Sequence, residues 1–169
     1  MIPSTTAAAA PDEGCRRSVS RIAQAGLAML VLAACSPSPP NAGEILREAL
    51  PESVAPGQHV TVKLAEAFSA SAWDTFAIMC PYEAPVDVAA DLGIPTAGIP
   101  DLARTDQYQA ILLLDDAALV HASQFPRGAI DLCSIHSEER VTLGANDDLV
   151  LTRDVKGTWT LASPVGMRS

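Results

Sequence analysis

Few side chains in this sequence stand at spacings that support catalysis or metal binding. The three histidines, His59, His121 and His136, belong to no HxxxH, HExxH or mixed Cys/His ligand pattern. No GxSxG or SxxK motif supplies an activated nucleophile, and no glycine-rich phosphate loop is present. We therefore expect no catalytic residue, no metal site and no cofactor, although His121 and His136 fall on neighbouring predicted strands and could approach each other.

Pairs of adjacent carboxylates, which could serve as an acid and a base, occur three times along the chain. The pairs are Asp115-Asp116, Glu138-Glu139 and Asp147-Asp148. Glycoside hydrolysis needs two carboxylates in a cleft, but each of these pairs falls in a predicted turn. Turns favour aspartate because its side chain hydrogen-bonds the nearby backbone, so we interpret the pairs as turn residues. The segment 144–148 is too short for a calcium loop.

The most distinctive setting belongs to Cys35, at the end of an apolar segment. Arginines at positions 16, 17 and 21 precede this segment, and residues 22–34 are apolar apart from Gln24. Its length fits the hydrophobic region of a signal peptide and is too short for a transmembrane helix of about 20 residues. The segment ends in Leu32-Ala33-Ala34-Cys35, where small residues precede a thiolate that can form a thioether. A chance apolar helix with a buried cysteine is the alternative interpretation.

The four residues Leu32-Ala33-Ala34-Cys35 resemble the lipobox of bacterial lipoproteins. The resemblance implies a signal peptide over residues 1–34, cleavage before Cys35, and diacylglycerol, carrying fatty acids such as palmitate, on that cysteine. Two acyl chains suffice for stable anchoring, so it also implies a location on the extracytoplasmic side of the cell membrane. Arg16-Arg17 suggests twin-arginine export, but Ser18-Val19-Ser20 follows and favours the general secretion route.

Two cysteines, Cys80 and Cys133, are left once Cys15 is removed with the leader and Cys35 carries lipid. Both fall on predicted strands beside apolar residues, and an oxidising compartment favours their pairing. Our hypothesis is a disulfide that closes a loop of about 50 residues and stabilises the fold by roughly 4 kcal/mol. Two separate buried thiols are the alternative. A redox or metal-binding role is disfavoured because the chain has no CxxC motif.

The chain after Cys35 is strongly acidic. It contains 18 Asp and Glu against 8 Lys and Arg, a net charge of about −10. Such a charge argues against nucleic-acid binding and against docking on anionic lipid head groups.

Residues 35–43 are interpreted as the lipidated cysteine and a flexible linker of Ser, Pro, Asn, Ala and Gly. A single domain is expected over residues 44–165.

Hydrophobic periodicity and turn residues predict the elements of this domain. Helices are expected over residues 44–50 and 85–92, the second with Pro85 in its first turn and Gly93 as its C-cap. Residues 111–114 are apolar on both faces, which predicts a central strand. The predicted strands cover residues 59–64, 73–80, 108–114, 119–125, 130–136, 149–154 and 158–162. These elements predict an α+β fold with one mostly antiparallel sheet of about six strands and one main helix, preceded by a signal peptide and a disordered linker.

The two tryptophans, Trp73 and Trp159, lie in or beside predicted strands. Core packing is the default interpretation, with Trp73 on the strand face that carries Ala77 and Met79. The sharper alternative is that they anchor a binding partner, since aromatic residues dominate interface energetics.

The segment 73–82 resembles a motif in small, poorly characterised lipoproteins of Gram-positive bacteria. These proteins carry Trp-Asp, an apolar strand, Pro-Tyr and a helix, then a hairpin that ends in Phe-Pro-Arg, matched here by Phe125-Pro126-Arg127. The hairpin turn at residues 115–118 departs from the more usual Asp-Gly type. The resemblance covers roughly residues 59–163 and implies a fold and a location but no activity.

The sequence thus favours a lipid-anchored envelope protein whose domain is a non-enzymatic binding or interaction module. A sheet face or edge could receive a protein or peptide partner at the cell surface. The alternative is a small envelope enzyme or ligand carrier with a pocket between helix 85–92 and the sheet, lined by groups such as Tyr82, His121 and His136. A purely structural envelope component is the third class.

Overall fold

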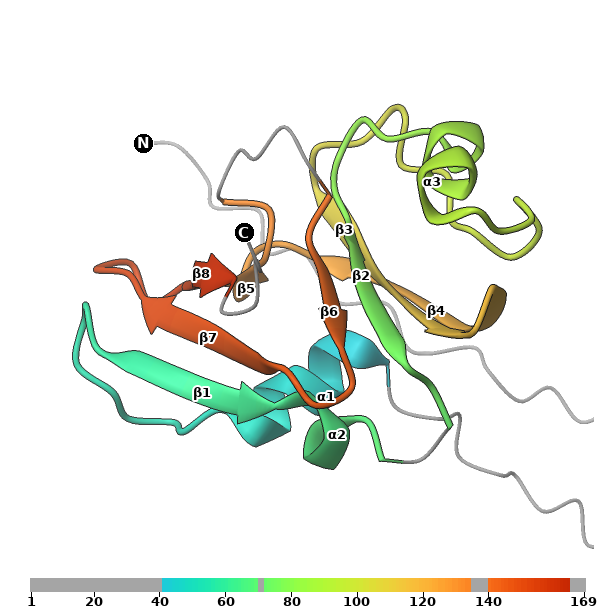
Figure 1. Ribbon diagram of the computed structural model, residues 1–169. Helices are drawn as coiled ribbons and strands as arrows, with labels where there is room; N and C mark the ends of the chain where they lie inside the picture. The colour runs from blue at the N-terminus through green and yellow to red at the C-terminus, as the bar shows by residue number, and fades with distance from the viewer. Residues whose placement is uncertain (1–40, 70–71, 135–139, 165–169) are drawn as a thin grey trace, which may run out of the picture. The chain divides into compact units, whose positions relative to one another are not determined.

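The computed structural model describes residues 41–69, 72–134 and 140–164 (Figure 1). The expected leader, Cys35, the linker up to residue 40, His136 and the Glu138-Glu139 pair lie outside these residues. In chain order the elements are α1 (Ala42–Ala49), β1 (His59–Lys63), α2 (Leu64–Ala67), β2 (Thr75–Met79), α3 (Pro85–Leu92), β3 (Tyr108–Asp115), β4 (Ala118–Pro126), β5 (Ile130–Asp131), β6 (Thr142–Gly144), β7 (Asp148–Arg153) and β8 (Trp159–Pro164).

The strands form two four-stranded sheets, so the prediction of a single sheet of about six strands is wrong. One sheet has the order β1-β7-β8-β5 and the other the order β4-β3-β2-β6. Every pairing is antiparallel except that of β5 with β8. The α+β class and the predominance of antiparallel pairing are confirmed. Alternation within a strand identifies its buried face but does not say which other strand it pairs with, and β1 pairs with the distant β7.

Strands β2 and β3 are buried on both faces, which makes their sheet the middle layer of the domain. One face contributes Phe76, Ile78, Ile111 and Leu113 to a core shared with the first sheet, α1 and α2. The other face contributes residues such as Ala77, Met79 and Leu112 to a second core with α3 and the loop after it. The prediction of a central strand at residues 111–114 is therefore confirmed.

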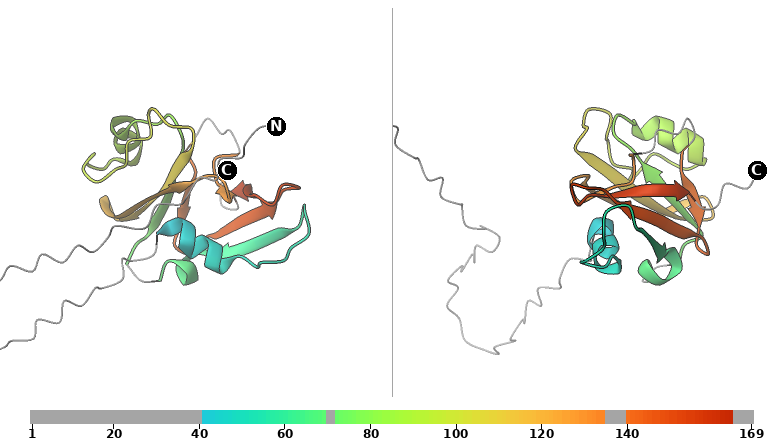
Figure 2. Two further views of the ribbon diagram at one scale, coloured as in Figure 1. Left: turned by 180° about the vertical axis from the view of Figure 1, so that it is seen from behind. Right: turned by 90° about the vertical axis from the view of Figure 1, so that its left-hand side faces the viewer.

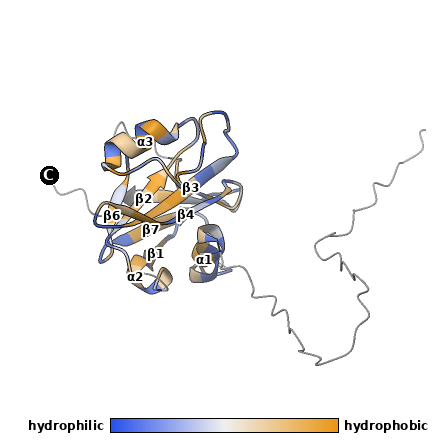
Figure 3. Cartoon of the chain, turned by 90° about the vertical axis from the view of Figure 1, so that its right-hand side faces the viewer, coloured by the Kyte–Doolittle hydropathy of each residue, from blue (hydrophilic) through white to orange (hydrophobic). Residues whose placement is uncertain are grey.

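The views in Figures 1 and 2 place α3 on one side of β2 and β3, and α1 and α2 on the other. Figure 3 shows hydrophobic colouring along β2 and the middle of β3, while α3 has both hydrophobic and hydrophilic residues. This distribution follows from burial. Strands covered on both faces are apolar throughout, and a helix that covers a sheet needs only one apolar face.

The helix boundaries follow from capping residues. Asn41 and Glu44 form a capping box at the start of α1, so this helix begins at Ala42, two residues before its predicted start and within the segment assigned to the linker. Helix α3 has the predicted bounds, with Pro85 in its first turn and Gly93 in the left-handed conformation at φ 68° as its C-cap.

Four local features differ from the prediction. Of the expected strand over residues 130–136, only β5 forms within the described residues, and Leu132 and Cys133 lie in a turn. Leu64 begins the short helix α2 instead of ending β1, and β6 was not expected. The β3–β4 hairpin is confirmed, but its register shifts between Leu113 and Leu114. The single extra residue of a β-bulge interrupts the alternation on which sequence patterns depend.

Candidate functional site

Cys80 and Cys133 are joined by a disulfide, as the sequence predicted, and their Cα atoms are 5.7 Å apart. Cys80 follows β2 of the middle sheet, and Cys133 follows β5 of the other sheet. The bridge therefore fastens the two sheets to each other at one end of β2. Cys133 is buried, with 6% of its surface exposed.

Both tryptophans pack against the core shared by the two sheets. Trp159 is only 8% exposed and lies beneath the guanidinium of Arg153, 6.0 Å from the ring centroid. Trp73 is half-buried, and its indole N–H donates to the carbonyl of Phe68 at 2.9 Å. It lies before β2 and packs with Phe68 and Phe76, so its predicted placement with Ala77 and Met79 is wrong. Trp159 offers little surface to a partner.

The described histidines lie on strands, and the described acidic pairs lie in or beside turns at strand ends. His59 is exposed on β1, and His121 is half-buried on β4 opposite Leu113. Within residues 41–69, 72–134 and 140–164, no three His, Cys, Asp or Glu side chains lie close enough to hold a metal ion. Asp116 lies in the β3–β4 turn, and the Asp147 carboxylate accepts the backbone N–H of Gly144 at 2.7 Å.

Asp74 secures the end of the β3–β4 hairpin. Its carboxylate accepts the backbone N–H of Asp116 at 2.8 Å, and its own N–H donates to the carbonyl of Leu114. Asp116 needs this support because its backbone has a positive φ of 52°. The hydrogen bond from Asp116, together with one from Thr75, holds the pKa of the Asp74 carboxyl below its ordinary value of 3.8. Asp74 is thus a structural residue of the turn.

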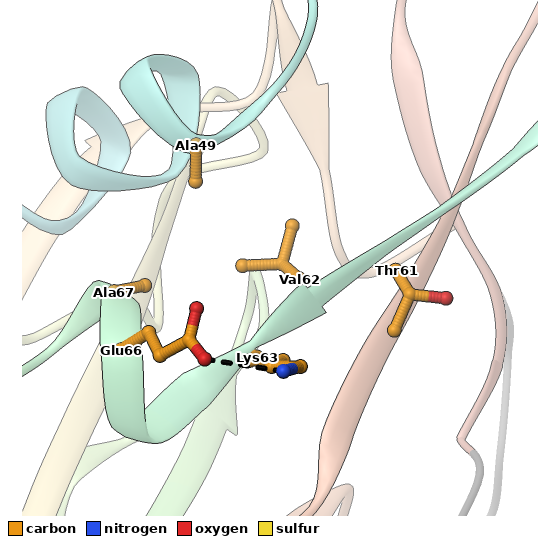
Figure 4. A pocket seen from close by; sticks show the side chains of 6 residues that line it. All are labelled: Ala49, Thr61, Val62, Lys63, Glu66 and Ala67. Atoms are coloured by element: carbon orange, nitrogen blue, oxygen red, sulfur yellow. Dashed lines mark hydrogen bonds and ion pairs between the residues drawn. The ribbon is translucent and has the colours of Figure 1, made fainter.

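A hollow of about 390 Å³ lies between α1, β1 and α2 (Figure 4). It is lined by Ala49, Thr61, Val62, Lys63, Glu66 and Ala67. Lys63 and Glu66 form an ion pair of 3.2 Å whose side chains are 66% and 74% exposed, so both remain hydrated. A second hollow of about 190 Å³ is lined by residues of α1, the end of β4 and the start of β5. Neither lining contains a cysteine or histidine, or a serine placed beside a base.

The space between α3 and the middle sheet is filled by apolar side chains. Val88 of α3 and Met79 of β2 are fully buried there, together with Leu102 from the loop after α3. Tyr82, which the sequence suggested as a lining residue of a pocket here, is instead 68% exposed. The described residues therefore give no support to a ligand cavity beneath α3.

Tyr82 is the most unusual residue of the described surface. It has a positive φ of 68°, a conformation that costs L-residues other than glycine about 1–2 kcal/mol. The N–H of Glu83 donates to the carbonyl of Cys80, which closes a turn with Pro81 second and Tyr82 third. This is the pattern of a type II turn, whose third position usually takes glycine or asparagine. An exposed tyrosine ring is thus presented at a strained position.

The turn around Tyr82 is held at several points. The Tyr82 N–H donates to the carbonyl of Leu102 at 2.9 Å, and Cys80 is fixed by the disulfide. The Glu83 carboxylate accepts the N–H of Cys80 and forms an ion pair with Arg140 at 2.9 Å. The same guanidinium reaches Asp91 of α3 at 3.1 Å. Arg140, with only 8% of its side chain exposed, thereby ties the turn to the helix.

Sequence patterns did not identify Arg140 or the conformation of Tyr82. Arg140 is 57 residues from Glu83 in the chain, and nothing local connects the two residues. A signal for the turn was present in Pro81, because proline favours the second position of type I and type II turns. A tyrosine after it gives no indication of a positive φ.

Comparison with protein-family models, with curated proteins and with solved structures finds no match to this chain. The resemblance to lipoproteins noted in the sequence thus stays a prediction. None of the helices in the described ranges is both long and apolar enough to cross a membrane.

Proposed function

We propose that this chain is a lipid-anchored protein of the cell envelope, held at the extracytoplasmic side of the membrane by diacylglycerol on Cys35. The proposal begins with the apolar segment 22–34 and the lipobox-like Leu32-Ala33-Ala34-Cys35. A thioether-linked diacylglycerol provides two acyl chains, which is enough for stable attachment without a transmembrane helix.

The main observation that supports export from the cytoplasm is the disulfide between Cys80 and Cys133. Disulfides persist in oxidising compartments and are rare in the cytosol. The bridge links segments 53 residues apart and joins the two sheets, so it belongs to the framework of the fold. A cysteine pair in this role supports folding outside the cytoplasm.

We infer further that the domain binds a partner and does not catalyse a reaction. The two hollows described above contain no cysteine, histidine or serine, and the amine and carboxylate of the first are exposed and paired with each other. The space beneath α3, where a ligand carrier would need a cavity, is filled by side chains. The surface does present an exposed aromatic residue on a rigid turn, and aromatic residues on rigid supports are typical interface anchors.

Substitution of Cys35 by serine tests the anchor. We expect the wild-type chain in the membrane fraction at the size of the processed form, labelled by a palmitate analogue. Cys35→Ser should abolish the label and leave an unprocessed chain, whereas Cys15→Ser should change nothing because Cys15 leaves with the leader. Recovery of Cys35→Ser in the membrane at the processed size would contradict lipidation at this position.

Affinity purification of the tagged chain from its own membranes tests the binding function. We expect a specific protein to be retained after washing with neutral detergent. If no protein is recovered above the level of an unrelated tagged lipoprotein, the binding function is wrong.

A further inference from the structure

We propose that Tyr82, Val86 and the carboxylates of Glu83, Asp87 and Asp91 form a docking surface for a basic, partly apolar segment of a partner protein. These five residues are called the Tyr82 surface below. The inference rests on the proposed binding function and names the surface and the chemistry of the partner.

The members of the Tyr82 surface lie close together along the chain, in the turn and on α3. Glu83 follows Tyr82 directly, and Arg140 bridges Glu83 to Asp91 through ion pairs of 2.9 and 3.1 Å. Asp87 lies one helical turn before Asp91 and therefore on the same side of α3. Its apolar members are prominent, since Tyr82 is 68% exposed and Val86 is 63% exposed.

The charge of the Tyr82 surface selects the partner. Residues 80–103 contain four acidic residues and no Lys, Arg or His. Arg140 neutralises only part of this charge, because a single guanidinium carries one positive charge against the three carboxylates of Glu83, Asp87 and Asp91. Nucleic acid and anionic lipid head groups would be repelled, as would another acidic copy of this chain. A Lys or Arg side chain would be attracted by the carboxylates and could lie over the Tyr82 ring, which favours cations on its face.

The rigidity of the turn strengthens this assignment. The disulfide at Cys80, the Tyr82 N–H bond to Leu102 and the Glu83–Arg140 ion pair fix the backbone that carries the ring before a partner arrives. An aromatic anchor on a backbone that is already fixed loses less conformational entropy on binding. Glycine would adopt the backbone conformation of this turn at a lower energetic cost. The stability of the turn therefore does not explain a tyrosine at this position, whereas a role of its side chain in binding does.

The test uses the full chain, solubilised in neutral detergent, on an array of immobilised octapeptides. The peptides alternate lysine with leucine, lysine with serine, or glutamate with leucine. We expect the strongest retention on lysine–leucine peptides, weaker retention on lysine–serine peptides, and none on glutamate–leucine peptides. Retention should fall as salt is raised to about 0.5 M, because salt screens exposed charges.

Tyr82→Gly is the decisive variant because glycine keeps the conformation of the turn. Its retention on lysine–leucine peptides should fall about tenfold, the loss expected when an interface anchor that contributes about 1.4 kcal/mol is removed, while its thermal midpoint should not fall. Asp87→Asn should weaken retention several-fold, since Asp87 is exposed and has no ion pair within the described residues. Glu48→Gln removes one exposed carboxylate from α1 as a matched control and should bind normally.

Equal binding by wild type and Tyr82→Gly, or equal losses in Asp87→Asn and Glu48→Gln, would overturn the proposal. Retention on glutamate–leucine peptides would do the same. These results can be separated from failure of the proposed function. If affinity purification recovers a specific partner and Tyr82→Gly recovers as much of it, the binding function stands and the Tyr82 surface is wrong.

Discussion

Gln109 connects the two sheets through hydrogen bonds of a single buried side chain. It lies on β3 and is fully buried. Its amide nitrogen donates to the carbonyl of Ile130 on β5, and its amide oxygen accepts the N–H of Leu132 at 2.9 Å. A buried amide is stable only when its donors and acceptors are paired, and here both partners come from the segment that leads to Cys133.

Gln109→Leu should lower the free energy of unfolding by about 2–6 kcal/mol. The substitution leaves the carbonyl of Ile130 and the N–H of Leu132 buried without these partners, at roughly 1–3 kcal/mol each. Urea denaturation measures the change. Gln124→Leu, at an exposed position of β4, is the matched control and should stay within about 0.5 kcal/mol. Similar losses in the two variants would contradict the bridging role of Gln109.

Asp74 gives the fold a local dependence on acid. Its pKa is lowered in the folded state by the hydrogen bonds from Asp116 and Thr75. A lowered pKa means that the ionised form stabilises the fold above the ordinary value of 3.8, and that this stabilisation disappears as the pH falls through the folded-state pKa.

Thermal midpoints measured across pH test this dependence. Asp74→Asn should melt below wild type at pH values above 3.8, and the difference should shrink as the pH falls below that value. Asp115→Asn, at an exposed neighbour in the same hairpin, should not reproduce this pattern. A difference between Asp74→Asn and wild type that stays constant with pH would show that the Asp74 charge is not responsible.

At the scale of elements, close packing against β4 fixes the position of α1. The N–H of Ala42 donates to the Ser123 hydroxyl at 2.8 Å. A Cβ atom on Gly43 would lie 2.8 Å from the ring of Phe125, which is buried at 4% exposure. The helix therefore needs glycine at this position although alanine has the higher helix propensity.

Gly43→Ala should lower the free energy of unfolding by up to about 2 kcal/mol. Crowding against Phe125 costs about 1–3 kcal/mol and outweighs the propensity gain of about 1 kcal/mol. Guanidinium denaturation gives the value. Gly128→Ala places a Cβ in open space and should be neutral or slightly stabilising. A stabilised Gly43→Ala variant would show that α1 does not pack against Phe125.

Elements whose signals are local could be predicted from the sequence, and long-range pairings could not. Pro85 and Gly93 marked both ends of α3, and the apolar run 111–114 identified the middle strand. The pairing of β1 with β7 left no local signal, so the division into two sheets was missed. For the candidate site, the disulfide could be predicted from cysteine number and compartment. The link from Arg140 to Glu83 and the conformation of Tyr82 arise only in the folded chain.

At the scale of the whole molecule, the Cys80–Cys133 bridge closes a long loop between the sheets. A loop of 53 residues is expected to contribute about 4 kcal/mol through the reduced entropy of the unfolded chain. The double variant Cys80→Ala/Cys133→Ala should lose about this amount in denaturant titrations. A reducing agent should destabilise wild type by a similar amount and leave the double variant unchanged. Equal effects of the reductant on the two proteins would contradict the bridge.

The acidic charge and the proposed anchor concern the molecule as a whole. With about −10 charges after Cys35, the domain would be repelled by anionic head groups, so attachment would depend on the lipid. Charge would also favour basic partners over acidic ones at the Tyr82 surface. The proposed anchor, the acidic charge and the exposed aromatic residue would together suit a protein that is held at the membrane and binds a partner outside it.

Mass spectrometry of the N-terminal peptide, prepared from the membrane fraction of cells that make the full chain, tests the central claim most directly. The account predicts that the mature chain begins at Cys35 and that this residue carries the added mass of diacylglycerol on its sulfur. A mature chain that begins elsewhere, or an unmodified Cys35 thiol in the membrane-bound protein, would contradict it.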